Sequence, residues 1–245
     1  MILTLLALAA IGVYQLGISS STLNQTLPQL AVAVVTAIVL DVAIKWYELK
    51  KFVIPKSATI TGLFVGSLLN PGTSLLLVLA TVVIAILSKH VIRVKKINVF
   101  NPAAFGLVVG DLLFKVGSAW WSASSIVAIF VLGIIVLYRI KRFVAAFTFI
   151  AVFDLLFAIS STQLVLKSPT ALLNPLVLFF AFFMLIEHKT SPLTLKSEIA
   201  YSIIVGVLAF AFFAYVDPLK PIFLLSALLV GNAFNTINNR MKLFL

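Results

Sequence analysis

Continuous apolar runs are the feature that most constrains this sequence. Along its 245 residues, with a mean hydropathy of +1.21, runs of Leu, Ile, Val, Phe and Ala recur between short polar connections. A helix that crosses a hydrocarbon layer about 30 Å thick needs roughly 20 such residues. At that length the sequence divides into ten segments, approximately 2–18, 28–46, 57–69, 74–92, 99–116, 120–138, 143–166, 169–186, 197–216 and 221–238. It therefore predicts an all-α, polytopic membrane protein with a single transmembrane domain over 1–245.

Two alternatives to this division are less favourable. A membrane β-barrel would alternate in polarity from residue to residue, whereas these runs are continuously apolar. The first run has neither the charged leader nor the small-residue cleavage site of a signal peptide, so we expect it to be a membrane span.

The distribution of cations supports the ten segments independently. The 18 Lys and Arg residues outnumber the 7 Asp and Glu residues, but they lie in short clusters between apolar runs, which argues against a nucleic-acid partner. If every segment crosses the bilayer, 15 of the 18 cations fall on one side and only Lys115, Lys167 and Lys220 on the other. The positive-inside rule then predicts a multi-pass protein of the cell membrane with both termini cytoplasmic.

Broken segments occur in both halves of the chain. The breaks are Asn70-Pro71-Gly72, Asn101-Pro102, Asn174-Pro175 and Gly231–Asn235. Interrupted segments at corresponding places in two halves often mark a site at mid-membrane depth. Because each half has five segments, an odd number, the second half must be inverted. The pattern predicts an inverted five-plus-five repeat with pseudo-repeats about 1–118 and 119–245.

Three carboxyl groups lie inside the apolar segments, where an ionised side chain is costly unless it is paired, hydrated or protonated. Asp111 lies four residues before Lys115, and we interpret the two as an ion pair. Asp41 and Asp154 occupy equivalent places in the two halves and have no obvious cationic partner within their own segments. Two interpretations of them stay open: an ion path, or structural carboxyls bonded to neighbouring polar groups.

Several chemistries are excluded by what the sequence lacks. With no cysteine there is no disulfide, thiolate-bound zinc or iron–sulfur cluster. Neither His90 nor His188 has a second ligand at metal-binding spacing, so no metal site is expected. Neither a catalytic triad order nor a phosphate loop is present, so we assign no catalytic residue. Trp120-Trp121 are interpreted as an aromatic anchor at the membrane interface.

Two stretches carry a more specific signal. The first is Ser88–Arg93 followed by Asn98–Gly106, and the second is Phe182–Thr194. In order and separation they resemble the two signatures of the RnfD/NqrB-like family, the flavin-carrying membrane subunits of Rnf and sodium-pumping NADH:quinone reductase complexes. The resemblance covers about 50–245.

This resemblance implies a ten-helix, urea-transporter-like fold with inverted repeats. It also implies partner membrane and redox subunits that couple electron flow to the movement of sodium ions or protons. Family members carry FMN on a threonine in the loop between the fifth and sixth spans. Here that loop, 115–125, contains no threonine, so covalent FMN is not expected and non-covalent riboflavin or FMN stays open. The cofactor-binding residues are then Asn101, Pro102, Phe105, Thr190, Ser191 and Thr194.

Three function classes follow. The first is a flavin-holding, non-catalytic subunit of a redox-driven ion translocase. The alternative is a small-solute transporter or channel on the same scaffold, and the third class is a structural assembly partner without a ligand. The residues expected to line an ion or solute path are Asp41, Asp154, Asn232 and Phe234. A pore between the repeats would also include Asn101 and Phe105.

Overall fold

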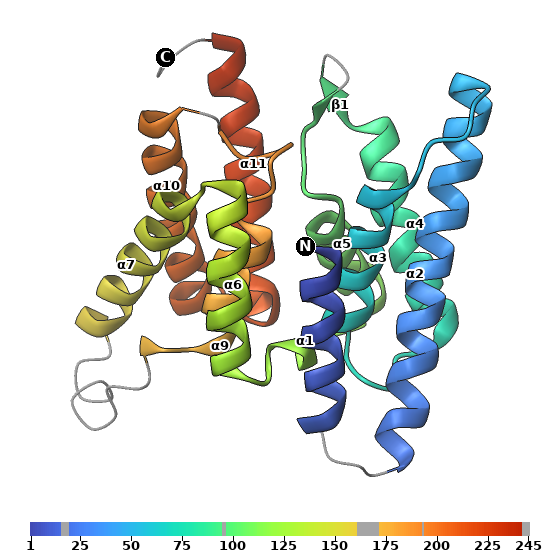
Figure 1. The fold of residues 1–245 in the computed structure, drawn as a ribbon. Coiled ribbons are helices and arrows are strands. Elements are labelled where there is room, and N and C mark those ends of the chain that lie inside the picture. Colours follow the sequence, from blue (N-terminus) through green and yellow to red (C-terminus); the bar gives the residue numbers. More distant parts are fainter. Residues whose placement is uncertain (16–19, 95–96, 161–171, 193, 242–245) are drawn as a thin grey trace. The chain divides into compact units, whose positions relative to one another are not determined.

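Helices make up nearly the whole structure, as Figure 1 shows. The computed structural model describes residues 1–15, 20–94, 97–160, 172–192 and 194–241. The elements of the first half are α1 (Ile2–Gln15), α2 (Ser20–Leu49), α3 (Lys56–Leu68), α4 (Leu75–Val91), β1 (Arg93–Val94), β2 (Ile97–Asn98), α5 (Pro102–Phe114) and η1 (Trp121–Ala123). Those of the second half are α6 (Ile126–Ile140), α7 (Phe143–Ser160), α9 (Pro175–Phe179), η3 (Phe180–Met184), α10 (Leu195–Tyr215), η4 (Asp217–Ile222) and α11 (Phe223–Met241).

Each of the ten predicted segments overlaps a helix, and the all-α prediction is confirmed. Four helical stretches within the described residues are long and apolar enough to cross a membrane: Asn24–Leu49, Phe143–Ser160, Leu195–Tyr215 and Asp217–Asn238. Shorter apolar helices occupy five more of the predicted segments. The chain is therefore an integral membrane protein. Parts of the predicted segments, namely 16–18, 161–166 and 169–171, lie outside the described residues, as do Lys167 and Leu193.

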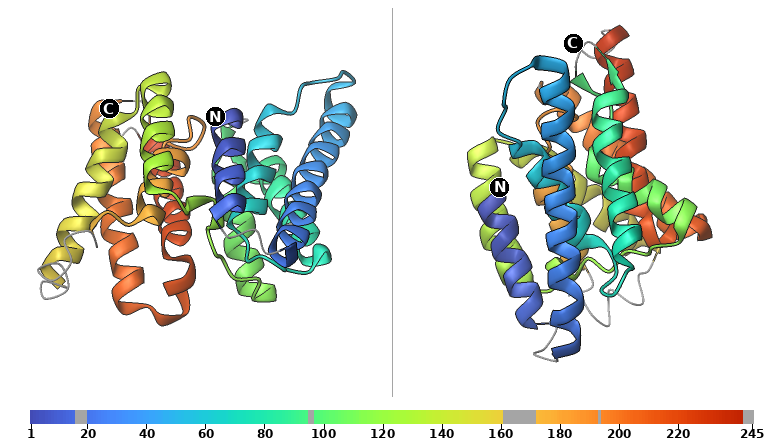
Figure 2. Two further views of the ribbon diagram at one scale, coloured as in Figure 1. Left: turned by 60° about the horizontal axis from the view of Figure 1, so that its bottom comes forward. Right: turned by 90° about the vertical axis from the view of Figure 1, so that its right-hand side faces the viewer.

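The chain forms two compact units. Unit 1 comprises Met1–Ile92 and Pro102–Ser125, and unit 2 comprises Arg93–Asn101 and Ile126–Leu245. In unit 1, α2 packs along α3 and α4, and α4 packs against α5 (Figure 2). Small residues allow these helices to approach closely. At Gly106 of α5 there is no room for a side chain, since an added Cβ would lie only 2.6 Å from the Ala85 Cβ of α4. Such contacts are typical of helices that associate in a membrane.

The tryptophan pair belongs to the interior of unit 1. Trp120 is 4% exposed and Trp121 is 3% exposed. The segment that carries them is tied to the end of α3, where the Leu68 carbonyl accepts the N–H of Ala119 at 2.9 Å, and η1 packs against α1. The prediction of an interfacial anchor was wrong. A ring that finds an apolar partner surface within the fold is stabilised by burial there, and these two rings do.

Unit 2 has a phenylalanine core. Here α7 packs against α10, α10 packs against α11, and α6 packs against α9 and η3. Phe179, Phe180, Phe182 and Phe183 have no exposed surface. The helix widens at this point, since the N–H of Leu185 donates to the Phe180 carbonyl at 3.0 Å, five residues back. A π-turn of this kind often accompanies a functional site, and this one contains the first three residues of the second signature.

Candidate functional site

A buried asparagine on α11 joins the two signatures. The Asn232 side chain is fully buried, and its Oδ1 accepts the backbone N–H of Asn101 at 2.9 Å. Its Nδ2 donates to the Tyr201 hydroxyl at 2.8 Å and lies 3.5 Å from the Thr190 carbonyl oxygen. A buried amide that satisfies donors and acceptors from three separate segments holds those segments in one arrangement.

The second signature folds into a compact turn beside this asparagine. Asn235, one turn further along α11, donates to the Thr190 carbonyl at 2.8 Å. The Ser191 hydroxyl donates to the Glu187 carbonyl at 2.8 Å, and the Thr190 hydroxyl lies 3.4 Å from the Glu187 carboxylate. Both hydroxyl side chains are buried. Asn101, Thr190, Ser191 and Asn232 are thus brought together in unit 2.

Four other residues predicted to form a site lie outside this network around Asn232. Thr194 is exposed and caps α10, since its hydroxyl oxygen accepts the N–H of Ser197 at 3.4 Å. Pro102 opens α5 and Phe105 follows one turn later, both in unit 1. Phe234 lies half-buried on α11.

Asp41 lies at the centre of a charged cluster in unit 1. Its carboxylate has no exposed surface and lies 2.7 Å from the Lys45 ammonium, 2.7 Å from the Lys89 ammonium and 3.0 Å from Nε2 of His90. The expectation that Asp41 has no cation in its own segment was wrong. Lys45 lies four residues along α2, on the same helix face, and this spacing was visible in the sequence.

The other two carboxyls differ from Asp41. Asp154 is half-buried on α7, and within the described part of the chain no group donates to its carboxylate or pairs with it. Asp111 accepts the backbone N–H of Gly117 at 3.0 Å and so closes the turn after α5. The prediction that it pairs with Lys115 was wrong: among the described residues, the contact between these two is the backbone bond that ends the helix, and the Lys115 side chain is exposed.

Sequence reasoning missed a second charged group in unit 2. Buried Glu198 on α10 accepts the N–H of Ala145 at 3.1 Å and lies 3.4 Å from the Arg142 guanidinium. Arg142 also donates to the carbonyl of Pro192. Glu198 therefore caps α7, and Arg142 ties the start of α7 to the second signature. Partners 53 residues apart leave no local pattern in the sequence.

Comparison with known families decides the identity. The sequence profile of the NQR2, RnfD, RnfE family matches residues 1–124. The chain belongs to the NQR2, RnfD, RnfE family. It is thus a membrane subunit of the type found in multi-subunit, ion-translocating complexes. No curated protein matches the chain.

The family match includes the whole first signature and the loop at 115–124. The second signature, Phe182–Thr194, lies beyond the matched residues. Asn232 bridges the two signatures, since it accepts the N–H of Asn101 in the matched one and lies 3.5 Å from the Thr190 carbonyl oxygen in the unmatched one.

Proposed function

We propose that this chain is the RnfD/NqrB-type subunit of a flavin-dependent electron-transport complex that moves sodium ions or protons. The observation that supports this most is the contact of both signatures with Asn232, at 2.9 Å to the Asn101 N–H and 3.5 Å to the Thr190 carbonyl. Because the family profile ends at residue 124, the relation of the second signature to the family is part of this proposal.

The loop between α5 and α6 favours a non-covalent flavin. It contains no threonine, and its central serine, Ser122, is 2% exposed within η1, next to the buried Trp121. Ser122 is too enclosed to carry a phosphoester-bound FMN, and the exposed serine of this loop, Ser124, is not the threonine that carries FMN in the family. We therefore propose riboflavin or FMN held by hydrogen bonds and apolar contacts.

Within unit 2, the residues proposed to hold the flavin are Asn101, Thr190, Ser191 and Thr194. A bound flavin supplies the capacity to accept and donate electrons, while the protein supplies position and polarity. Thr190 and Ser191 are already fixed by Glu187, so the polar edge of such a site is formed in advance. Preformed polar groups lower the ordering cost of binding.

The proposal includes an inverted repeat on a urea-transporter-like scaffold. The packing of corresponding helices supports it. In unit 1 the fourth helix, α4, packs against the second and the fifth, α2 and α5. In unit 2 the fourth helix, α10, likewise packs against α7 and α11. In this relation Asp41 corresponds to Asp154. We propose that both carboxyl groups lie on the ion path. Among the described residues, no cation pairs with the carboxylate of Asp154.

The experiment is an absorption spectrum of the purified protein in mild detergent, before and after acid precipitation. We expect a flavin spectrum that moves to the supernatant on precipitation. Asn232→Leu should lose the flavin and Tyr201→Phe, which removes one partner of Asn232, should keep part of it. Asn174→Ala is the matched control, since Asn174 is an exposed cap of α9 and its loss costs about 1 kcal/mol of stability without touching the network.

Two results would contradict the proposal. Colour that stays in the pellet would mean covalent attachment. A protein that stays colourless after incubation with riboflavin and FMN would favour the solute transporter, with a path along Asn232 and Phe234.

A further inference from the structure

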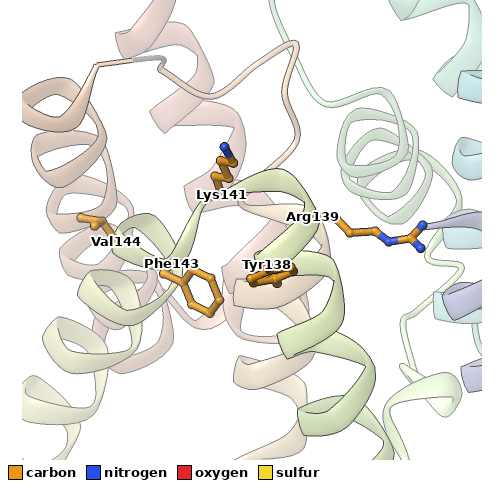
Figure 3. A pocket seen from close by; sticks show the side chains of 5 residues that line it. All are labelled: Tyr138, Arg139, Lys141, Phe143 and Val144. Carbon is orange, nitrogen blue, oxygen red and sulfur yellow. The ribbon is translucent and has the colours of Figure 1, made fainter.

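A cavity of about 570 Å³ lies at the turn between α6 and α7. Figure 3 shows its five lining side chains, Tyr138, Arg139, Lys141, Phe143 and Val144, all projecting from this one turn. The lining combines two cations with two aromatic rings and an aliphatic side chain. Such a lining suits a ligand that is anionic at one end and apolar at the other.

The two cations are available to a ligand. Arg139 and Lys141 are exposed, and within the described residues no hydrogen bond or ion pair engages either side chain. Arg142, the third cation of this turn, is buried and bonded to Glu198 and to the Pro192 carbonyl. The turn thus uses one of its three charges for the fold and leaves two exposed beside the cavity, where Lys141 and Arg139 extend in different directions (Figure 3).

The backbone of the turn is well fixed. The Leu137 carbonyl accepts the N–H of Lys141 at 2.7 Å and the N–H of Arg142 at 3.3 Å. Lys141 has a φ of +58°, the left-handed conformation that commonly ends a helix. Since Arg142 also anchors the turn to α10, the two free cations extend from a rigid base. Little backbone order has to be created when a ligand binds.

The position of the turn relates it to the membrane surface. One of the four stretches long and apolar enough to span a membrane begins at Phe143, and the apolar helix α6 ends at Ile140. Tyr138, which is 75% exposed, is of the residue type that concentrates at the level of lipid headgroups. Cations at such a boundary are attracted to anionic lipids.

We propose that this cavity binds the phosphate group of an anionic phospholipid. Arg139 presents a planar fork of N–H donors that matches phosphate oxygens, and Lys141 adds a point charge. Phe143, Val144 and the Tyr138 ring contact the apolar part of the lipid. The site differs from the Asn232 network and does not rest on the proposed flavin function.

The test is a titration of the full-length protein, in mild detergent, with phosphatidylglycerol, phosphatidylcholine or inorganic phosphate, followed by native mass spectrometry. In the double variant Arg139→Gln, Lys141→Gln, we expect phosphatidylglycerol to bind about tenfold or more weakly, because both charges that attract it are gone. Binding of phosphatidylcholine should not change. Both residues are exposed, so the thermal unfolding curve should match that of the wild type.

The matched control is Lys51→Gln, Lys56→Gln, which removes two charges from exposed positions elsewhere that form no ion pair among the described residues. It should bind phosphatidylglycerol as the wild type does. Equal weakening in both double variants, or wild-type binding in the Arg139→Gln, Lys141→Gln protein, would overturn the site. Inorganic phosphate that competes with phosphatidylglycerol on equal terms would assign the cavity to a free phosphate and overturn the lipid assignment.

Discussion

The carboxylate of Asp41 has no exposed surface and has two lysine ammonium groups at 2.7 Å. Lys45 belongs to the same helix, whereas Lys89 comes from α4, 48 residues away. Lys89 is itself almost fully buried, so each of the two buried charges is compensated by the other. Removing one partner from such a pair costs more than the pair contributes, because the remaining charge is left without compensation.

We therefore expect Asp41→Asn to lower the free energy of unfolding by about 3–5 kcal/mol, because buried Lys89 would lose its counter-charge. Lys45→Gln is the control. Its side chain is 20% exposed, so its loss should cost less than about 1 kcal/mol. Denaturant unfolding in detergent measures both. Equal stability of Asp41→Asn and wild type would mean that the cluster does not stabilise the fold.

Asp154→Asn, unlike Asp41→Asn, should leave the stability of the fold almost unchanged. No group of the described residues pairs with this carboxyl, so the variant should unfold within about 0.5 kcal/mol of wild type. If Asp154 lies on the ion path, electron transfer in the assembled complex should continue while ion uptake into vesicles falls. Unchanged coupling in this variant would leave Asp154 as a structural carboxyl.

At the scale of the elements, helix positions follow from the sequence and irregularities within helices do not. The predicted segment 169–186 contains a helix, but it begins at Pro175, where Asn174 caps it, and it widens at Phe180–Met184. The Asn-Pro signal was visible along the chain. The π-turn was not, because it accompanies the fully buried phenylalanine rings of unit 2, and their packing depends on neighbouring helices.

The close contact of α4 and α5 gives a prediction of its own. A Cβ at Gly106 would lie 2.6 Å from the Ala85 Cβ and 2.8 Å from the Thr81 carbonyl oxygen, so Gly106→Ala should force the helices apart and cost about 1–3 kcal/mol. In Gly206→Ala the nearest atom is a Val152 methyl at 3.0 Å. There the higher helix propensity of alanine, about 1 kcal/mol, should offset the crowding. Thermal unfolding of the two variants measures the difference, and equal losses would contradict it.

For the whole molecule, the family match and the structural division nearly coincide. The profile ends at residue 124, and unit 1 ends at Ser125. The match thus covers unit 1 together with 93–101, the part of unit 2 that contains β1 and β2. The rest of unit 2 lies beyond the matched residues, and Asn232 links it to Asn101 within the same unit.

The orientation of the whole chain can be measured directly, because the protein has no cysteine to remove. Single cysteines at exposed Ser74 and exposed Lys51 fall on opposite sides in the ten-segment topology. In intact cells, Ser74→Cys should react with a membrane-impermeant maleimide, and Lys51→Cys should react only after permeabilisation. The reverse result would invert the predicted topology, and labelling of both from outside would contradict the number of crossings.

The helical class, the placement of ten apolar segments and the family can all be read from the sequence, and the family profile contains the first of the two signatures. These properties depend on transfer free energies and motifs that can be read along the chain. Which polar groups meet depends on the tertiary structure. The network of Asn232 with Asn101, Thr190 and Tyr201, and the burial of Trp120 and Trp121, join residues from separate segments. Such pairings depend on how the helices pack, and apolar helices of similar composition carry little local information about their neighbours.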